Sequence, residues 1–280
     1  MGKLDGRTAI ITGAARGQGR AHALAFAAEG AAIVACDIAE QIDGVPYALA
    51  TKSDLEETAR LVREAGGTCI TERVDVRGRD AMAAVVARAD SELGGVDILV
   101  NAAAIVHWKS FDELTESDWR DVLAVNVTGS VNAIHAVLPG MVQRHYGRII
   151  CTGSTLGRQG GRNLAGYSAS KWALHGLVKC IAIEYAASGI TANIINPTIV
   201  NTPMMDNENA YKLFCPDIEH PTREDALPRY QTLNQIPVPW VEPDVISRAV
   251  LFLASDDASF ITASTFLVDG GISAAYVTPL

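Results

Sequence analysis

The chain has 280 residues, of which 49% are hydrophobic, and its formal net charge at neutral pH is -9. This length is sufficient for one large α/β domain with a full core. The acidic balance argues against nucleic acid or an anionic membrane as a partner, because both favour a basic protein surface.

The cysteines and the N-terminus predict neither export nor a membrane anchor. The five cysteines are scattered, without a Cys-x-x-Cys pair, which is typical of reduced thiols in a cytoplasmic protein. The first residues, Met-Gly-Lys-Leu-Asp-Gly, lack the hydrophobic region of a signal peptide. We also expect no apolar run long enough to cross a bilayer. The sequence therefore predicts a cytoplasmic protein, and we expect no metal site in it.

The first segments predict a strand, a glycine-rich turn and a helix. Thr8–Thr12 is a short β-branched run typical of a buried strand, and an alanine-rich helical stretch covers 20–29. The turn between them contains Gly13, Arg16, Gly17, Gln18 and Gly19. Glycines at this place let backbone N–H groups approach a pyrophosphate, which sits at the N-terminus of the helix. The combination predicts a dinucleotide-binding start.

Asp37 decides the predicted choice of dinucleotide. It follows a second predicted strand, Ala32–Cys36, and lies 18 residues after Gly19. An acidic residue there accepts hydrogen bonds from the adenosine ribose hydroxyls, and it repels the 2′-phosphate of NADP. Arg16 argues the other way, because a basic residue in the glycine loop could pair with that phosphate. We give Asp37 the greater weight, because direct contact with the ribose is expected there, and predict NAD.

The connection 38–52 is unusually long and apolar. Such connections usually have about 2 to 6 residues, whereas this one contains Ile42, Val45, Tyr47 and Leu49. One interpretation is an insertion that folds over the adenosine end of the cofactor and slows its release. The alternative, a surface loop packed on a neighbouring helix, is equally compatible with the sequence.

Strand and helix patterns continue to alternate after this insertion. A capping box at Ser53–Glu56 opens a predicted helix, followed by a strand over 68–74, a helix over 80–93 and a strand over 96–100. This alternation predicts an α/β fold, a single Rossmann-type domain over 1–280 with a doubly wound parallel sheet of about seven strands flanked by helices. Asp75 ends the third strand, where its carboxylate could accept a hydrogen bond from the adenine amine.

The second half of the chain adds a long helix, three strands and an irregular region. The helical pattern 115–142 contains Asn126, whose amide needs a partner, either a backbone carbonyl or a water linked to Lys171. Strands are expected over 148–152, 190–196 and 265–268, and a helix over 243–254. Region 203–240, rich in methionine and aromatic residues, predicts a substrate lid over an adaptable apolar pocket. His107 and Trp108 are candidate substrate contacts.

Ser154, Tyr167 and Lys171 form the candidate catalytic group. Tyr167 and Lys171 are four residues apart in a helical pattern, so their side chains emerge from one face. A free tyrosine has a pKa of about 10, and a neighbouring ammonium favours its ionised form. With the Ser154 hydroxyl, this pair suits proton transfer to and from an alcohol oxygen. Tyr-x-x-x-Lys alone is common by chance, so its interpretation as a catalytic pair depends on the other motifs of the chain.

With these segments placed, the sequence resembles the short-chain dehydrogenase/reductase family over nearly its whole length. The matching residues are Thr12-Gly13-x-x-x-Gly17-x-Gly19, Asn101-Ala-Ala-Ala, Asn126, Ser154, Tyr167-x-x-x-Lys171 and Pro197 with Thr202. Two departures from the family pattern occur. Ala102 and Ala104 stand where Asn and Gly are usual, and Thr198 replaces the usual Gly after Pro197, a change that the narrower branch described below shares. We expect the site to tolerate both changes.

The resemblance implies a role for each matching residue. Tyr167 would be the general acid/base, Ser154 would bind the reacting oxygen, and Lys171 would bind the nicotinamide ribose. Asn126 would hold a proton-relay water, and Thr202 would contact the nicotinamide carboxamide. Further cofactor contacts are expected from Ile38, Asp75, Val76, Asn101, Ala102, Ala103, Pro197, Val200 and Met204.

A narrower resemblance concerns the carveol-dehydrogenase-type, mycofactocin-coupled branch of this family. It rests on Gly-Ala-Ala-Arg-Gly-Gln-Gly-Arg, on the segment Ile-Asp-Gly-Val-Pro-Tyr-x-Leu-Ala-Thr, and on Pro197-Thr198-x-Val-Asn-Thr-Pro-Met. This resemblance implies NAD held so tightly that electrons leave through another carrier, mycofactocin. Membership of the family also implies a homotetramer.

The sequence therefore predicts an NAD-dependent alcohol dehydrogenase that oxidises a hydrophobic secondary alcohol, terpenoid or otherwise alicyclic. One alternative is a ketone reductase or steroid-type dehydrogenase with freely exchanging NAD. A second alternative, of another class, is a non-catalytic NAD-binding regulator. The irregular region 203–240 carries no pattern from which the substrate can be read.

Overall fold

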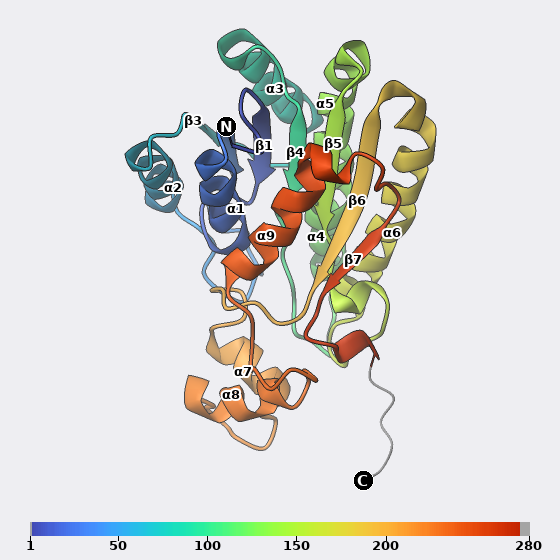
Figure 1. The fold of residues 1–280 in the computed structure, drawn as a ribbon. Coiled ribbons are helices and arrows are strands. Elements are labelled where there is room, and N and C mark those ends of the chain that lie inside the picture. Colours follow the sequence, from blue (N-terminus) through green and yellow to red (C-terminus); the bar gives the residue numbers. More distant parts are fainter. Residues whose placement is uncertain (1, 275–280) are drawn as a thin grey trace.

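The computed structural model describes residues 2–274 and arranges them around one parallel sheet (Figure 1). The strands are β1 (Thr8–Thr12), β2 (Ala32–Asp37), β3 (Cys69–Arg73), β4 (Ile98–Asn101), β5 (Gly147–Thr152), β6 (Ile190–Pro197) and β7 (Thr265–Val268). Their order is β3-β2-β1-β4-β5-β6-β7, and all neighbours pair in parallel. The order reverses between β1 and β4, which opens a crevice at the carboxyl ends of these strands. The predicted fold class is confirmed.

Helices cover both faces of this sheet (Figure 1). One face carries α1 (Gly17–Ala28), α2 (Lys52–Glu64) and α9 (Pro243–Ala254), and the other carries α3 (Arg79–Leu93), α4 (Glu116–Leu123), α5 (Gly129–Arg144) and α6 (Ala165–Tyr185). In β1, Ala9 and Ile11 pack on the first face and Ile10 packs on the second. Because strands buried on both faces need apolar side chains on both, these segments are nearly continuous hydrophobic runs.

Region 203–240, expected to be irregular, contains two short helices. These are α7 (Glu208–Phe214) and α8 (Arg223–Gln231), which lie beyond the carboxyl ends of the strands (Figure 1). Asn207 caps α7, and Thr222 forms a capping box with Asp225 at the start of α8. The helices share a small core of their own that contains Tyr211 and Tyr230. This region, which we call the lid after its predicted role, is therefore locally folded. Local caps define its helices, which are too short for their periodicity to reveal them.

Two helices begin earlier than predicted. α1 begins at Gly17, inside the glycine turn. α2 begins at Lys52, and its capping box joins Thr51 to Asp54 rather than starting at Ser53. The Asp54 carboxylate accepts from the Thr51 N–H at 2.8 Å, and the Thr51 hydroxyl accepts in return from the Asp54 N–H. An aspartate at the third helical position fulfils the role that the sequence reading assigned to Glu56.

The long helical run 116–144 is interrupted by a π-helical segment, Ala124–Thr128, that contains Asn126. Among the described residues this run is also apolar and long enough to cross a membrane, with a mean hydropathy of 1.4. The expectation that no run has this length was therefore wrong. However, 56% of its most apolar window is buried within the protein, as in the core helix of a soluble fold.

Candidate active site

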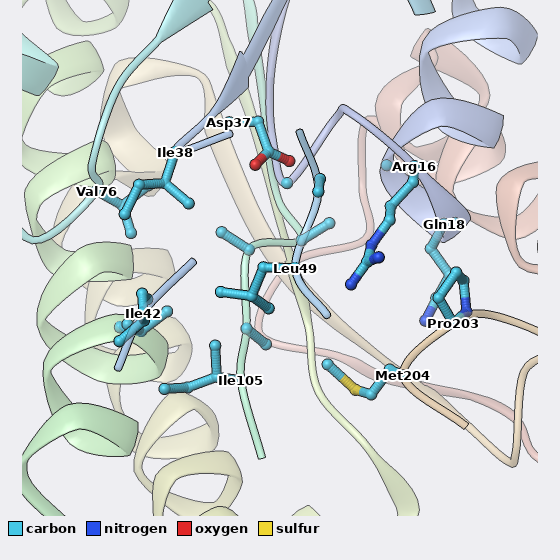
Figure 2. A pocket seen from close by; sticks show the side chains of 18 of the residues that line it. Arg16, Gln18, Asp37, Ile38, Ile42, Leu49, Val76, Ile105, Pro203 and Met204 are labelled. Atoms are coloured by element: carbon cyan, nitrogen blue, oxygen red, sulfur yellow. The ribbon is translucent and has the colours of Figure 1, made fainter. Parts of the chain in front are cut away.

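A cleft of about 890 Å³ lies at the carboxyl ends of β1, β2 and β4. In the close view, Asp37 lies at one end, Pro203 and Met204 lie toward the other, and Leu49 of the insertion stands between them (Figure 2). Of the predicted cofactor contacts, this cleft is lined by Gly13, Arg16, Gly17, Gln18, Gly19, Asp37, Ile38, Asp75, Val76, Ala102, Ala103, Thr202 and Met204. The crevice predicted for a dinucleotide therefore has the predicted residues around it.

The glycine turn is a close-packed cradle for a phosphate group. Gly13 and Gly17 have positive φ angles of 68° and 54°, which side chains other than glycine rarely adopt. A Cβ on Gly19 would lie 2.1 Å from the carbonyl oxygen of Gly13, so the turn closes only with glycine there. The first N–H groups of α1 start at this turn and are free of helical partners. This geometry fits a pyrophosphate.

Asp37 presents a carboxylate at the adenosine end of the cleft. Its Oδ2 accepts from the Ala15 N–H at 3.1 Å and its Oδ1 from the Ala39 N–H at 3.0 Å. Burial raises the pKa of this carboxyl, opposed by those two hydrogen bonds and by Arg16. A carboxylate fixed by two backbone donors keeps lone pairs for two vicinal hydroxyls, and its negative charge would repel a phosphate.

Arg16, whose charge could favour the 2′-phosphate of NADP, is hydrogen-bonded to the insertion instead. Its guanidinium donates to the carbonyl oxygen of Ala48 in the insertion. The group is half-buried, and burial lowers its pKa. The side chain therefore ties the insertion to the glycine turn, and the structure supports the greater weight given to Asp37.

The adenine end contains Ile38, Asp75 and Val76. The Asp75 carboxylate accepts from the Arg77 N–H at 2.9 Å and from the Arg77 guanidinium at 2.8 Å. Burial alone would raise the pKa of Asp75, but the hydrogen bonds and charge of Arg77 lower it. Asp75 lines the cleft as predicted, although Arg77 already occupies part of its hydrogen-bonding capacity.

The insertion 38–51 packs over the cleft. Ile42, Val45 and Tyr47 are buried, and the Tyr47 ring centroid lies 5.2 Å from that of Trp108. The amide of Asn209, on α7 of the lid, donates to the carbonyl oxygen of Pro46 in the insertion. Of the two interpretations of this segment, packing over the cofactor cleft is the one that its lining residues favour.

A second cleft, of about 820 Å³, continues from the first. The two share five lining residues: Gln18, Ala102, Ala104, Thr202 and Met204. The second is also lined by Ser154, Tyr167, Lys171, Pro197 and Val200. Of the predicted cofactor contacts, only Asn101 lines neither cleft, because its buried amide faces the sulfur of Cys151 at 3.6 Å.

Tyr167 and Lys171 lie one turn apart on α6, as predicted. The Lys171 Nζ donates to the carbonyl oxygen of Thr152 at 2.7 Å and lies 5.4 Å from the Tyr167 ring centroid. Burial lowers the pKa of Lys171 to about 8. Burial also raises the pKa of Tyr167 to about 12, opposed by hydrogen bonding from Ser154. The expected depression of the Tyr167 pKa is therefore not a property of the protein alone, because desolvation outweighs the hydrogen bond from Ser154.

Two hydrogen bonds hold Ser154 just after the end of β5, and each joins a backbone N–H to a side-chain oxygen. Its N–H donates to Oδ1 of Asn196 at 3.2 Å, and its Oγ accepts from the Leu156 N–H at 3.1 Å. It is the N-cap of a short 3₁₀ turn, Thr155–Gly157. Because Oγ already accepts one hydrogen bond, its own proton remains for an acceptor in the cleft.

Asn126 lies in the π-helical segment and lines neither cleft. Its amide nitrogen donates to the Ile105 carbonyl and lies 3.0 Å from the Ser170 Oγ, and its Oδ1 accepts from the Ile105 N–H. The first of the two predicted partners, a backbone carbonyl, is therefore present. These contacts join α6 to the segment after β4, and a relay through Asn126 stays a prediction.

The segment after β4 is held by a residue that the sequence reading did not assign. The hydroxyl of Thr12 accepts from the N–H groups of Ala102 and Ala103, at 3.1 and 3.2 Å. These backbone contacts explain how the segment keeps its place although Ala102 and Ala104 replace the usual residues. The Thr12 side chain matched the family pattern, but only the fold places it against this segment.

Trp108 and His107 have different surroundings. Trp108 lines the second cleft, as expected for a substrate contact. His107 lines neither cleft, and its Nδ1 lies 3.4 Å from Oδ1 of Asp118. Burial lowers the pKa of His107, and Asp118 opposes this. The possible role of His107 as a substrate contact therefore has no support in the geometry.

Comparison with known proteins identifies the family to which this chain belongs. The family model described as short chain dehydrogenase matches residues 7–212, so the chain belongs to the short-chain dehydrogenase/reductase family. Its class is NAD-dependent alcohol dehydrogenase. Among its relatives is a (-)-trans-carveol dehydrogenase from Rhodococcus erythropolis, 39% identical over 97% of this chain and 99% of the relative.

Solved structures show the same relationship. A carveol dehydrogenase from Mycobacterium avium in complex with NAD has a TM-score of 0.96 and 37% identity, covering 98% of this chain and all of that chain. A levodione reductase has a TM-score of 0.85 and 30% identity with the same coverage. The resemblance to carveol dehydrogenases read from the sequence is thereby confirmed.

Gly19→Ala tests the phosphate cradle. Its Cβ would overlap the Gly13 carbonyl, so we expect NAD affinity to fall at least about tenfold, since a displaced turn loses several backbone contacts. Isothermal titration calorimetry with NAD measures this change. Gly160→Ala is the control, because a Cβ there meets nothing within 4 Å. Unchanged NAD affinity in Gly19→Ala would contradict the assignment.

Proposed function

We propose that this enzyme oxidises a hydrophobic secondary alcohol, terpenoid or otherwise alicyclic, by transferring its hydride to NAD. The observation that carries the proposal is the continuity of the two clefts. Ser154, Tyr167 and Lys171 line the part that continues from the dinucleotide crevice. The glycine cradle and the Asp37 carboxylate fit the pyrophosphate and ribose of NAD, which when bound supplies the hydride acceptor.

The proposed mechanism assigns proton handling to the protein. The Ser154 hydroxyl donates to the substrate oxygen and fixes its position beside Tyr167. The Tyr167 phenolate takes the hydroxyl proton as the carbon–hydrogen bond breaks. The buried Lys171 ammonium is oriented by the Thr152 carbonyl. It would stabilise that phenolate and hold the nicotinamide-side ribose. Asn126 would complete the group by holding a relay water.

The lining of the second cleft supports an apolar substrate. Its walls include Trp108, Leu156, Leu164, Ile199, Met205, Leu213 and Phe214. Lys171 is the one charged side chain among the residues that line it. A charged substrate would lose its hydration there without a partner. The similarity to a (-)-trans-carveol dehydrogenase supports the same class of small cyclic alcohol.

The same geometry also supports the reverse reaction, so a ketone reductase or steroid-type dehydrogenase with exchangeable NAD is the second candidate. Levodione reductase, among the structural relatives, favours it. Asp37 favours oxidation, because it selects the dinucleotide that cells keep largely oxidised. A non-catalytic regulator has less support, since the cleft retains Ser154, Tyr167 and Lys171 together.

Retention of NAD between turnovers is part of the proposal, with mycofactocin as the external electron carrier. The support is a clasp, formed where the insertion meets both the glycine turn and the lid. Arg16 bonds to Ala48 on one side and Asn209 bonds to Pro46 on the other. Release of NAD would require these contacts to open together, which slows dissociation.

A homotetramer in the cytoplasm completes the proposal. Three large apolar side chains, Trp119 on α4 and Trp172 and Ile183 on α6, are 37%, 54% and 77% exposed. An apolar surface of this kind favours burial against a second copy. The five cysteines are all free thiols, in keeping with a reducing compartment.

Tyr167→Phe tests the catalytic assignment. We expect alcohol oxidation to fall by about a hundredfold to ten-thousandfold, the range that general-base catalysis contributes, while NAD stays bound. Wild-type oxidation should rise with pH, because burial raises the pKa of Tyr167 and the base must lose its proton. Stopped-flow absorbance of bound NADH measures both. Tyr185→Phe, on the same helix, is the control, and comparable rates in both variants would refute the assignment.

Asn209→Ala tests the clasp. Asn209 lines neither cleft, so it affects NAD only through its bond to Pro46. We expect NAD to dissociate roughly two- to fivefold faster, the effect of one exposed hydrogen bond. Native mass spectrometry after timed dilution measures the retained fraction. Asn201→Ala removes a comparable bond, to Glu242, and should change nothing. Equal retention in all three proteins would exclude the clasp.

A further inference from the structure

We propose that Asn196 and His175 are positioning residues that hold Ser154 with its hydroxyl proton directed into the cleft. The inference rests on the proposed function, in which Ser154 binds the reacting oxygen. Asn196 lies near the end of β6 and is fully buried. His175 lies on α6, one turn after Lys171 and two turns after Tyr167. Neither residue touches the cofactor cleft, so each would act through Ser154.

The hydrogen bonds join three elements behind the catalytic turn. The Ser154 N–H donates to Oδ1 of Asn196 at 3.2 Å. The Nδ2 of Asn196 lies 3.2 Å from Nε2 of His175, and the Nδ1 of His175 lies 3.4 Å from Oγ1 of Thr265 on β7. The Asn196 amide and the His175 ring thus link two strands and α6 behind the turn that contains Ser154.

The chemistry of these groups fixes the direction of every bond. A backbone N–H only donates, so the oxygen of Asn196 must face Ser154 and its nitrogen must face His175. Nε2 of His175 must then accept, which places the ring proton on Nδ1, toward Thr265. Burial lowers the pKa of His175; the hydrogen bond with Asn196 opposes this shift, and the charges of Arg158 and Lys179 add to it. The neutral ring that this arrangement requires is therefore the favoured form.

Two glycines show how closely the turn that contains Ser154 packs against Asn196 and His175. A Cβ on Gly153 would lie 2.1 Å from Oδ1 of Asn196, and one on Gly157 would lie 2.7 Å from Nε2 of His175. These positions flank Ser154 on both sides. The backbone is thus fixed by Asn196, and the Ser154 Oγ accepts from Leu156. The hydroxyl proton is left to point at the reacting oxygen.

The protonation of His175 tests the network independently of any activity. Long-range proton–nitrogen correlation spectra of isotope-labelled histidine, assigned with His175→Gln, distinguish the two neutral forms of the ring. We expect the proton on Nδ1. In Asn196→Asp a carboxylate oxygen replaces the amide nitrogen, so the proton should move to Nε2. A proton on Nε2 in the wild type would overturn the proposal.

Single-turnover hydride transfer tests the consequence for Ser154. His175→Leu should slow the step about tenfold, since small displacements of a reacting group reduce rates strongly, with NAD affinity and substrate KM unchanged. His175→Gln, whose side-chain oxygen accepts from Asn196, should recover most of the rate. The control is His135→Leu, on the exposed side of α5. A wild-type rate in His175→Leu, or a loss confined to NAD affinity or KM, would overturn the proposal.

The two proposals fail in different ways. If the wild type oxidises no secondary alcohol, the proposed function fails, and the position of the His175 proton still decides whether the network exists. If the wild type is active and Ser154→Ala is slow, but His175→Leu is not, the positioning proposal fails alone.

Discussion

Burial of one cation determines the layout of this enzyme. Lys171 is 2% exposed, and its ammonium donates to the Thr152 carbonyl at the end of β5. A buried charge without a partner costs several kcal/mol, so the register of α6 against β5 is tightly constrained. That register also sets the height of Tyr167, one turn earlier, and brings its phenol beside Ser154. The arrangement of the proposed catalytic group is therefore a consequence of how one lysine is buried.

The same sheet edge joins two clefts with different residues for binding. The end formed by β1 and β2 carries the glycine turn and the Asp37 carboxylate, which suit a pyrophosphate and a ribose. The end formed by β5, β6 and the lid is apolar, which suits a cyclic hydrocarbon carrying a hydroxyl. The insertion and the lid, far apart in the sequence, contact each other through Pro46 and Asn209. In the proposed function, this contact would link cofactor retention to substrate entry.

Much of the fold and of the candidate site could be predicted from the sequence, because the motifs that indicate them are local. The glycine turn, Asp37, and the spacing of Tyr167 and Lys171 each depend on neighbouring residues, and the sheet follows from alternating patterns. The helices of the lid were missed because each is about two turns long. The bond of Ser154 to Asn196 spans 42 residues, and that of Asn196 to His175 spans 21. Such contacts leave no periodic pattern in the sequence. The orientation of the Asn101 amide toward Cys151 leaves none either.

Because the pKa of Tyr167 is raised, ionisation of its phenol depends on positive charge in the site. Burial favours the neutral phenol, so the Lys171 ammonium needs help from a second cation. The most direct test follows the ring-carbon chemical shift of labelled Tyr167 with pH in protein loaded with oxidised NAD and with NADH, using Tyr167→Phe for assignment. The account predicts a lower pKa with the cationic oxidised ring. Equal values in the two states would contradict it.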